Sequence, residues 1–313
     1  MARHKYRIYG LVVESELALT SVEPCDETLP ADISIVFGVP AEFERRAAGL
    51  RHDAEDVVRY LPLDDGGLYI RIAQAFEAIV EPNGRRVVCA RLEGFDERTF
   101  EANLANYALS ASLTLQGEEC LHATVVALGD RAVGLIGPSG DGKSTLAGCL
   151  LGRGAALVTD DMLRLVFKGE RLLAQPGPYR LKLFEDSARQ VLEGALNDGN
   201  LNRLSRKMMF RLDERRVRRA TRAVPLAALF WLGEPSPPGS EEVSVESLTG
   251  IAPVKALTHA SMNGRYYAPE RLERQLRFAE RVARQVPVFA LQYRRDYALL
   301  DKVADALERV VGA

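Results

Sequence analysis

The sequence predicts an α/β protein of two domains, and three observations lead to this prediction. Short β-branched or aromatic runs separated by turn residues fill the first 116 positions. Apolar strand patterns alternate with helix patterns from residue 117 onward. The segment GPSGDGKS stands between one such strand pattern and one such helix pattern. We therefore expect a smaller α+β domain over 1–116 and a larger α/β domain over 117–313.

Composition excludes several classes of protein. The chain has 313 residues, of which 47% are hydrophobic, so it can bury the cores of two domains. A net charge of −2 gives no overall attraction to nucleic acid or to an anionic membrane. No apolar run approaches the roughly 18 residues that a membrane helix requires. Glu14 and Glu16 interrupt the apolar stretch near the N-terminus, which therefore does not resemble a signal peptide.

The four cysteines are far apart in the sequence and form no metal-ligand pair. Widely spaced thiols in a chain of this length are typical of a reduced, cytoplasmic protein. We therefore expect a cytoplasmic protein with neither nucleic acid nor membrane as a partner. The four positions are Cys25, Cys89, Cys120 and Cys149.

The first domain is expected to contain several strands and one helix. Asn83-Gly84 stands between two apolar runs, a pattern typical of a β-hairpin. Apolar residues recur at steps of three and four over 96–116, which predicts a helix. The expected strands are YRIYGLVVES, DISIVFG, GLYIRIA, AFEAIVE and RRVVCARL.

The second domain begins with two buried-looking strands, CLHATVVAL and AVGLIG, around the turn Gly129-Asp130. The glycine-rich segment, a helix and the strand AALVT follow. A further hairpin, LRLVFKG with RLLAQPG, comes next. The remaining elements are strands at VPLAALFWLG and VPVFALQY and helices at EDSARQVLEGAL, PERLERQLRFAERVARQ and DYALLDKVADALERV.

The glycine-rich segment has the composition of a phosphate-binding loop. Gly137, Gly142, Lys143 and Ser144 satisfy the pattern G-x-x-x-x-G-K-[ST]. Glycines allow consecutive N–H groups to face phosphate oxygens, and the following helix adds the positive end of its dipole. Lys143 supplies a charge for the β- and γ-phosphates, and the Ser144 hydroxyl is a ligand for Mg²⁺. The expected nucleotide-binding residues are Gly137, Pro138, Ser139, Gly140, Asp141, Gly142, Lys143, Ser144 and Thr145.

Two aspartates and one histidine are expected beside this loop. Strands joined by a crossover helix run parallel, so Asp160 and Asp161 reach the same sheet edge as the loop. One carboxylate can hold Mg²⁺, and the other can accept a proton from an incoming hydroxyl. His122 starts the strand before the loop strand. If the two strands are neighbours, it can hydrogen-bond to a catalytic aspartate and change its pKa.

Basic residues later in the chain are candidates for substrate contacts. Arg180 and Lys182 alternate along an expected strand and can face one side of it. The segment 206–222 carries eight basic residues, of which Lys207 or Arg211 can reach the γ-phosphate. The alternative interpretation of this segment is a solvated helix face.

The stretch LHATVVALGDRAVGLIGPSGDGKSTLAGCLLGRGAALVTDDMLRL, residues 121–165, resembles the catalytic domain of the HPr kinase/phosphorylase family. The spacings of His122 and Asp160 from Lys143 look like those of the family. The resemblance implies that Asp160 is the general base toward a serine hydroxyl, that His122 supports it, and that Asp161 binds Mg²⁺. Assembly into oligomers is also implied.

The chain departs from the bifunctional members of that family. It has Gly-Lys-Ser-Thr where they have Gly-Lys-Ser-Glu, and it lacks their Glu-x-Arg-Gly signature. These departures count against the phosphorylase reaction and against HPr as the acceptor. The segments YRIYGLVVESELAL and PGPYRLKLF are more similar to kinases of lasso-peptide gene clusters, which resemble serine kinases acting on the C-terminal residue of a precursor peptide.

The function expected from the sequence is transfer of the γ-phosphoryl group of ATP, with Mg²⁺, to a serine hydroxyl of a peptide or protein. The acceptor indicated by the narrower resemblance is the C-terminal serine of a lasso-peptide precursor. Two alternatives remain open. A small-molecule kinase would need a closed acceptor pocket, whereas a peptide kinase needs an open groove. A nucleotide-responsive binding module would need no general base.

Overall fold

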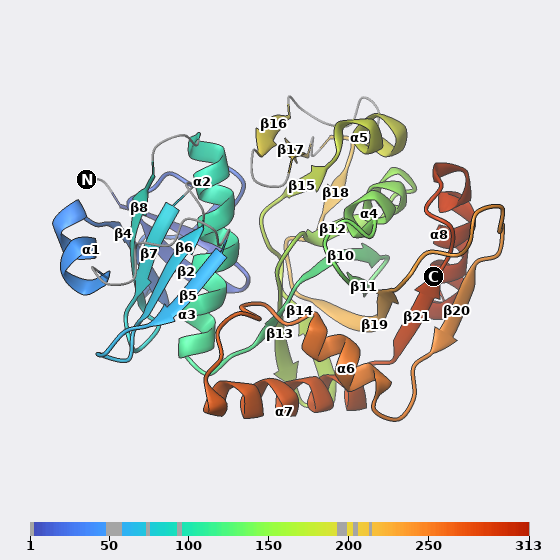
Figure 1. Ribbon diagram of the computed structural model, residues 1–313. Coiled ribbons are helices and arrows are strands. Elements are labelled where there is room, and N and C mark those ends of the chain that lie inside the picture. Colours follow the sequence, from blue (N-terminus) through green and yellow to red (C-terminus); the bar gives the residue numbers. More distant parts are fainter. Residues whose placement is uncertain are drawn as a thin grey trace. The chain divides into compact units, whose positions relative to one another are not determined.

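The computed structural model describes residues 3–47, 58–72, 76–92, 96–192, 199–202, 206–212 and 215–312. It is a mixed α/β structure that is rich in sheet (Figure 1). The chain forms two compact units. The first contains Met1–Cys120 together with Met262–Arg274, and the second contains Leu121–Ser261 together with Gln275–Ala313. The sequence gives no sign that a segment from the second half joins the first unit.

The first unit is built on one eight-stranded sheet of order β3-β1-β2-β4-β8-β7-β6-β5. Antiparallel hairpins form where the sequence places turn residues: the Asn83-Gly84 turn joins β7 to β8, with Gly84 at a φ of 68°. The strands are β1 (His4–Ile8), β2 (Leu11–Ser15), β3 (Glu23–Pro24), β4 (Ile33–Phe37), β5 (Val58–Pro62), β6 (Leu68–Ile72), β7 (Phe76–Val80) and β8 (Arg86–Arg91).

Helices complete the first unit. Besides α1 (Pro40–Ala47), one long helical run follows the expected 96–116 pattern as α2 (Glu97–Asn103), a π-helical turn (Leu104–Ala108) and α3 (Leu109–Leu115). The run begins at Asp96, whose carboxylate accepts a hydrogen bond from the backbone N–H of Thr99 at 3.0 Å.

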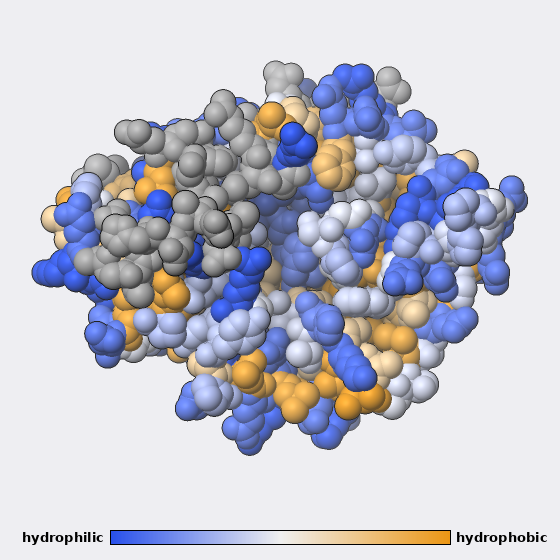
Figure 2. Space-filling model, viewed as in Figure 1, coloured by the Kyte–Doolittle hydropathy of each residue, from blue (hydrophilic) through white to orange (hydrophobic). Residues whose placement is uncertain are grey.

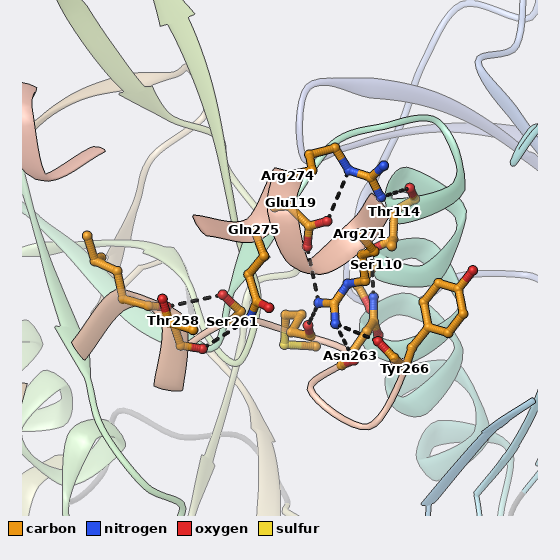
Figure 3. A network of polar contacts seen from close by, with 12 residues as sticks. Ser110, Thr114, Glu119, Thr258, Ser261, Asn263, Tyr266, Arg271, Arg274 and Gln275 are labelled. Atoms are coloured by element: carbon orange, nitrogen blue, oxygen red, sulfur yellow. Dashed lines mark hydrogen bonds and ion pairs between the residues drawn. The ribbon is translucent and has the colours of Figure 1, made fainter. Parts of the chain in front are cut away.

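The segment 262–274 belongs to this unit and is attached to it by a buried ion-pair cluster (Figure 3). The Glu119 carboxylate lies 3.1 Å from Arg271 and 3.2 Å from Arg274. Asn263 bridges α3 by accepting a hydrogen bond from Ser110 and donating one to Thr114. The segment is therefore attached to the first unit by polar contacts, which no hydrophobic period in the sequence reveals.

The second unit contains a ten-stranded sheet with the main order β18-β12-β10-β11-β19-β14-β13-β9; β21 pairs with β19 and with β20. Its central strands β10 (Ala123–Leu128) and β11 (Arg131–Ile136) form the hairpin expected around Gly129-Asp130. The other strands are β9 (Cys120–Leu121), β12 (Ala156–Thr159), β13 (Leu163–Lys168), β14 (Arg171–Ala174), β18 (Arg218–Arg219), β19 (Val224–Leu232), β20 (Ser244–Ser247) and β21 (Val288–Gln292).

Helices cover both faces of this sheet (Figure 1). Leu146 and Leu150 of α4 pack with α5 and α8 residues on one face. Ala256 and Leu257 of α6 pack with α7 residues on the other. Successive residues of the strands point to opposite faces of the sheet and contribute to two separate hydrophobic cores. The helices are α4 (Lys143–Gly152), α5 (Glu185–Leu192), α6 (Ala252–His259), α7 (Pro269–Gln285) and α8 (Leu300–Val311), the last preceded by a short 3₁₀ turn (Tyr297–Leu299). Residues 193–196 of the helix expected at EDSARQVLEGAL lie outside the described residues.

A separate three-stranded sheet has the order β15-β17-β16, with β15 (Arg180–Leu183), β16 (Asn200–Asn202) and β17 (Lys207–Arg211). The basic segment 206–222 therefore contains strands β17 and β18, so its interpretation as a solvated helix face is wrong. β-branched residues do not mark this strand. Pairing with β15 on one side and β16 on the other forms it instead. Asp213 and Glu214 of this segment lie outside the described residues.

Among the described residues, no helix has both the length and the apolar character needed to cross a bilayer. All four cysteines carry free thiols. The surface around α8 and β20 is largely hydrophilic in the view of Figure 2, in keeping with the charged outer face of α8.

Candidate functional site

The direction of β10 brings the candidate residues together. β11 and β12 are not neighbours: β10 lies between them and runs antiparallel to both. The carboxyl ends of β11 and β12 and the beginning of β10 therefore share one edge of the sheet. The glycine-rich loop follows β11, the aspartates follow β12, and His122 immediately precedes β10.

The loop adopts a conformation that only glycine accommodates easily. Gly137, Gly140 and Gly142 have φ values of 143°, 101° and 92°. A Cβ added at Gly137 would lie 2.7 Å from the backbone oxygen of Leu232, so the loop passes directly against the end of β19. Gly142 is the N-cap of α4 and provides no side-chain hydrogen bond to the first turn. The N–H groups of that turn are thus left for another acceptor.

Lys143 is buried, and its ammonium group is held by the loop itself. It donates hydrogen bonds to the backbone oxygens of Gly137 at 2.8 Å and Pro138 at 2.7 Å. Burial lowers the pKa of Lys143 to about 8, and the positive charge of Lys207 contributes to the shift. An incoming anion would therefore stabilise the charged form of Lys143.

Asp160 is a buried acceptor of three hydrogen bonds. Its Oδ1 accepts from the hydroxyl of Thr124 at 2.7 Å and from that of Ser144 at 3.3 Å. Its Oδ2 accepts from the backbone N–H of Lys182 at 2.9 Å. Asp160 thus joins the first turn of α4 to β10 and β15.

The carboxylate of Asp161 has a different partner from that of Asp160. Its carboxylate forms an ion pair with Lys182 at 2.5 Å. Its φ is 72°, a left-handed conformation that is uncommon for a residue with a side chain. His122 supports this conformation, because its Nδ1 lies 2.9 Å from the Asp161 backbone oxygen. A carbonyl oxygen only accepts, so Nδ1 carries the hydrogen, and His122 contacts the backbone of the aspartate rather than its carboxylate.

The pKa of Asp160 is raised, whereas the pKa values of Asp161 and His122 are lowered. Burial raises the pKa of the Asp160 carboxyl, and the charge of Asp161 raises it further. Burial acts in the same direction on Asp161, but the charge of Lys182 outweighs it and lowers the pKa of that carboxyl. Burial lowers the pKa of His122 to about 4, with the charge of Lys143 adding to the effect, so the imidazole is neutral near pH 7.

His122 and Asp161 line a pocket of about 40 Å³, whereas Asp160 is not among its lining residues. At roughly 10–15 Å³ for one water position, the enclosed space suits a phosphate group rather than a whole nucleotide. The sequence did not single out Thr124, Leu183 or Phe184; the hydroxyl of Thr124 on an otherwise apolar strand was the one available signal. The lining residues are His122, Thr124, Ser139, Gly140, Gly142, Lys143, Ser144, Thr145, Asp161, Lys182, Leu183, Phe184 and Lys207.

The basic candidates Lys207, Arg211 and Arg180 differ in their surroundings. Lys207 lines the pocket, and its ammonium lies 5.4 Å from the centroid of the Phe184 ring. Arg211 instead stacks on Tyr179 and donates to its hydroxyl at 2.9 Å. Arg180 is buried on β15 and does not line the pocket, although its charge lowers the pKa of Asp161.

The donor set fits Mg²⁺ bound together with a substrate phosphate. Within the described part of the chain, no group of three His, Cys, Asp or Glu side chains could hold a metal by itself. Mg²⁺ normally takes one or two carboxylates, substrate phosphate oxygens and water rather than a cage made wholly of protein. Ser144 Oγ and Asp160 Oδ1, 3.3 Å apart, are such a partial set.

Comparison with known proteins gives little further information. No family model matches the chain, and no curated protein matches it. Among solved structures, the chain is similar to the Hpr(Ser) kinase/phosphatase from Coxiella burnetii, with 12% sequence identity and a TM-score of 0.32. The match covers 61% of this chain and 95% of that one. A similarity of this size does not establish a common function.

Proposed function

We propose that the second unit catalyses ATP-dependent phosphoryl transfer to a hydroxyl group. The observation that carries this proposal is the loop 137–144 itself. Its three left-handed glycines, an α4 N-terminus without a side-chain cap and the buried Lys143 form one anion-binding surface. A purely structural turn would need neither a buried ammonium group nor a buried carboxylate 3.3 Å from the following serine.

In this proposal, the phosphates of ATP replace the carbonyl oxygens that Lys143 now contacts. The backbone N–H groups of the loop and the first turn of α4 bind phosphate oxygens without loss of side-chain conformational entropy. Lys207, whose charge already lowers the pKa of Lys143, is close enough to balance charge on the terminal phosphate.

Ser144 and Asp160 are the proposed magnesium ligands. Mg²⁺ held by these two residues and by phosphate oxygens would neutralise the negative charge that accumulates during transfer. The resemblance of the sequence to the kinase family implied Asp161 for this role and Asp160 for the general base. The contacts favour the reverse, because the oxygens of Asp160 already accept three hydrogen bonds, one of them from Ser144.

Asp161 is the proposed acceptor of the proton from the attacking hydroxyl. Its position in the pocket lining and its ion pair with Lys182 support this role. A carboxylate of lowered pKa is a weak base, which is sufficient because phosphoryl transfer relies mainly on positioning and charge stabilisation. His122 positions Asp161 by holding its backbone carbonyl.

The proposed acceptor is a serine of a peptide or protein, as the sequence resemblance implies. Lys182, Phe184 and Lys207 are among the lining residues of the pocket. Phe184 is 45% exposed, so an apolar surface beside two ammonium groups is available to an acceptor. Arg180 remains a candidate only through its charge.

The test is phosphoryl transfer from radiolabelled ATP with Mg²⁺. The acceptors are HPr, a lasso-type precursor peptide ending in serine, and free serine. Label on one acceptor, lost on Asp161→Asn substitution, would support the proposal and identify the acceptor class. Label on free serine alone would favour a small-molecule kinase. Tight ATP binding with no transfer to any acceptor would favour a nucleotide-responsive binding module and remove the role given to Asp161.

A further inference from the structure

The sheet order gives the bound nucleotide a direction. β11, which leads into the phosphate loop, has β10 and then β12 on one side and β19 and then β21 on the other. The two aspartates and His122 lie on the β10 and β12 side. If the terminal phosphate of ATP faces that side, as the proposed function requires, the nucleoside end of the molecule would extend toward the ends of β19 and β21.

Both β19 and β21 run parallel to β11, so their carboxyl ends reach the same sheet edge as the loop. Ligands of open α/β sheets bind at this edge. The residues immediately after β21 are Tyr293, Arg294 and Arg295. Sequence patterns had assigned them no role.

Arg295 is fixed across the ends of the two strands. Its Nη2 donates to the backbone oxygen of Gly233 at 2.8 Å, and its Nη1 donates to that of Tyr293 at 3.2 Å. Its guanidinium carbon lies 4.3 Å from the centroid of the buried Tyr293 ring. Two hydrogen bonds and one stacking contact thus hold the guanidinium plane in place while the side chain stays partly exposed.

This plane lies next to the phosphate loop. A Cβ added at Gly142 would be 3.8 Å from Cδ of Arg295 and 3.6 Å from the hydroxyl of Tyr293, which are ordinary contact distances. Gly142 is also the N-cap of α4, where the phosphates are proposed to bind. A nucleotide leaving the loop in the direction of β21 therefore meets Arg295 first.

We propose that Arg295 is the nucleobase platform of the site, with the aromatic ring of the donor nucleotide stacked on the guanidinium face opposite Tyr293. This inference rests on the proposed function. Guanidinium planes stack on aromatic rings and are weakly hydrated, so one fixed over the Tyr293 ring by two hydrogen bonds offers a base a preformed surface. Its fixed hydrogen bonds mean that little side-chain entropy is lost on binding. A Lys at this position would keep the charge and lose the plane.

The experiment compares ATP with inorganic tripolyphosphate by calorimetric titration in the presence of Mg²⁺. The proteins are wild type, Arg295→Ala, Arg295→Lys and Arg294→Ala. Arg294 is the matched control, because it lies on the same loop and pairs with Asp296 at 2.9 Å. Thermal denaturation of each variant checks that the second unit is folded.

We expect Arg295→Ala to weaken ATP binding on the order of tenfold, since stacking contacts are worth about 1–3 kcal/mol. Tripolyphosphate binding should change less than about threefold, because the platform contacts no phosphate. Arg295→Lys should not restore ATP binding, and Arg294→Ala should leave both ligands unaffected.

Equal weakening of ATP and tripolyphosphate in Arg295→Ala would overturn the inference, because Arg295 would then act by charge alone. Rescue by Arg295→Lys would do the same. If Arg295→Ala does not fold, the two ligands are still compared on the wild-type protein. The inference then requires ATP to bind more tightly than tripolyphosphate. Wild type that binds tripolyphosphate and ATP equally would refute the platform and leave the phosphate loop intact. Wild type that binds neither would refute the proposed function, and the platform with it.

Discussion

Replacing Arg271 by alanine tests the buried ion-pair cluster of the first unit. The Arg271 side chain is 2% exposed, and that of its partner Glu119 is 1% exposed. The guanidinium also donates hydrogen bonds to the backbone oxygens of Met262, Asn263 and Tyr266. Removing one partner of a buried pair costs about 3–5 kcal/mol, mostly because the remaining groups stay buried without a partner. We expect a loss within that range.

Arg274 provides a matched comparison. It contacts the same carboxylate at a similar distance, 3.2 Å against 3.1 Å, but its side chain is 35% exposed. Water can therefore replace most of what Arg274→Ala removes, and the expected loss is about 1 kcal/mol. Arg271 differs from Arg274 in its burial and in its hydrogen bonds to three backbone oxygens, where Arg274 has one, to Thr114.

The assay is urea denaturation followed by circular dichroism and by fluorescence of the single tryptophan. Trp231 belongs to the second unit, whereas circular dichroism reports on both units. Arg271→Ala should lower the midpoint of the dichroism transition more than that of the fluorescence transition. Equal losses for Arg271→Ala and Arg274→Ala would refute the reasoning from burial.

Three further predictions concern the second unit. Gly137→Ala should abolish measurable ATP binding in a calorimetric titration, since its Cβ would meet the Leu232 oxygen at 2.7 Å. Asp160→Asn should raise the Mg²⁺ concentration for half-maximal transfer, whereas Asp161→Asn should lower kcat by about 10²–10⁴ with unchanged Mg²⁺ dependence. His122→Asn should remove part of the acid sensitivity of stability. The unfolded chain binds a proton as the pH falls through 6.5, but the folded chain does so only near pH 4. Wild type therefore loses up to about 3 kcal/mol over that window as the pH falls.

Each of these predictions has its own control. Gly129→Ala tests whether a left-handed glycine alone matters, because Gly129 has a φ of 60° and open space around it. Exchange of the two aspartate phenotypes would restore the assignment implied by the sequence resemblance. Parallel stability curves for wild type and His122→Asn in urea titrations between pH 4 and 6.5 would show that His122 is not the sensitive group.

The sequence predicts the strands and helices around the glycine-rich loop well, because periodicity and turn chemistry are local properties. The hairpin at Gly129-Asp130 and the long helix ending at Leu115 follow directly from them. The site also depends on contacts between distant segments. Thr124 reaches Asp160 through the pairing of β10 with β12, whereas Lys182 reaches it from a separate sheet, and no spacing in the sequence indicates either contact. The strand Lys207–Arg211 likewise depends on its neighbours rather than on its own composition.

Both sheets of the second unit contribute residues to the candidate site. The loop and the aspartates follow strands of the large sheet and Lys143 begins α4, whereas Lys182 and Lys207 lie on strands of the small sheet. Lys182 joins the two sheets, through its backbone to Asp160 and through its side chain to Asp161. A displacement of the three-stranded sheet would therefore either break the hydrogen bond from Lys182 to Asp160 and the ion pair with Asp161, or carry both aspartates with it. The position of the small sheet is thus mechanically coupled to the two aspartates through Lys182.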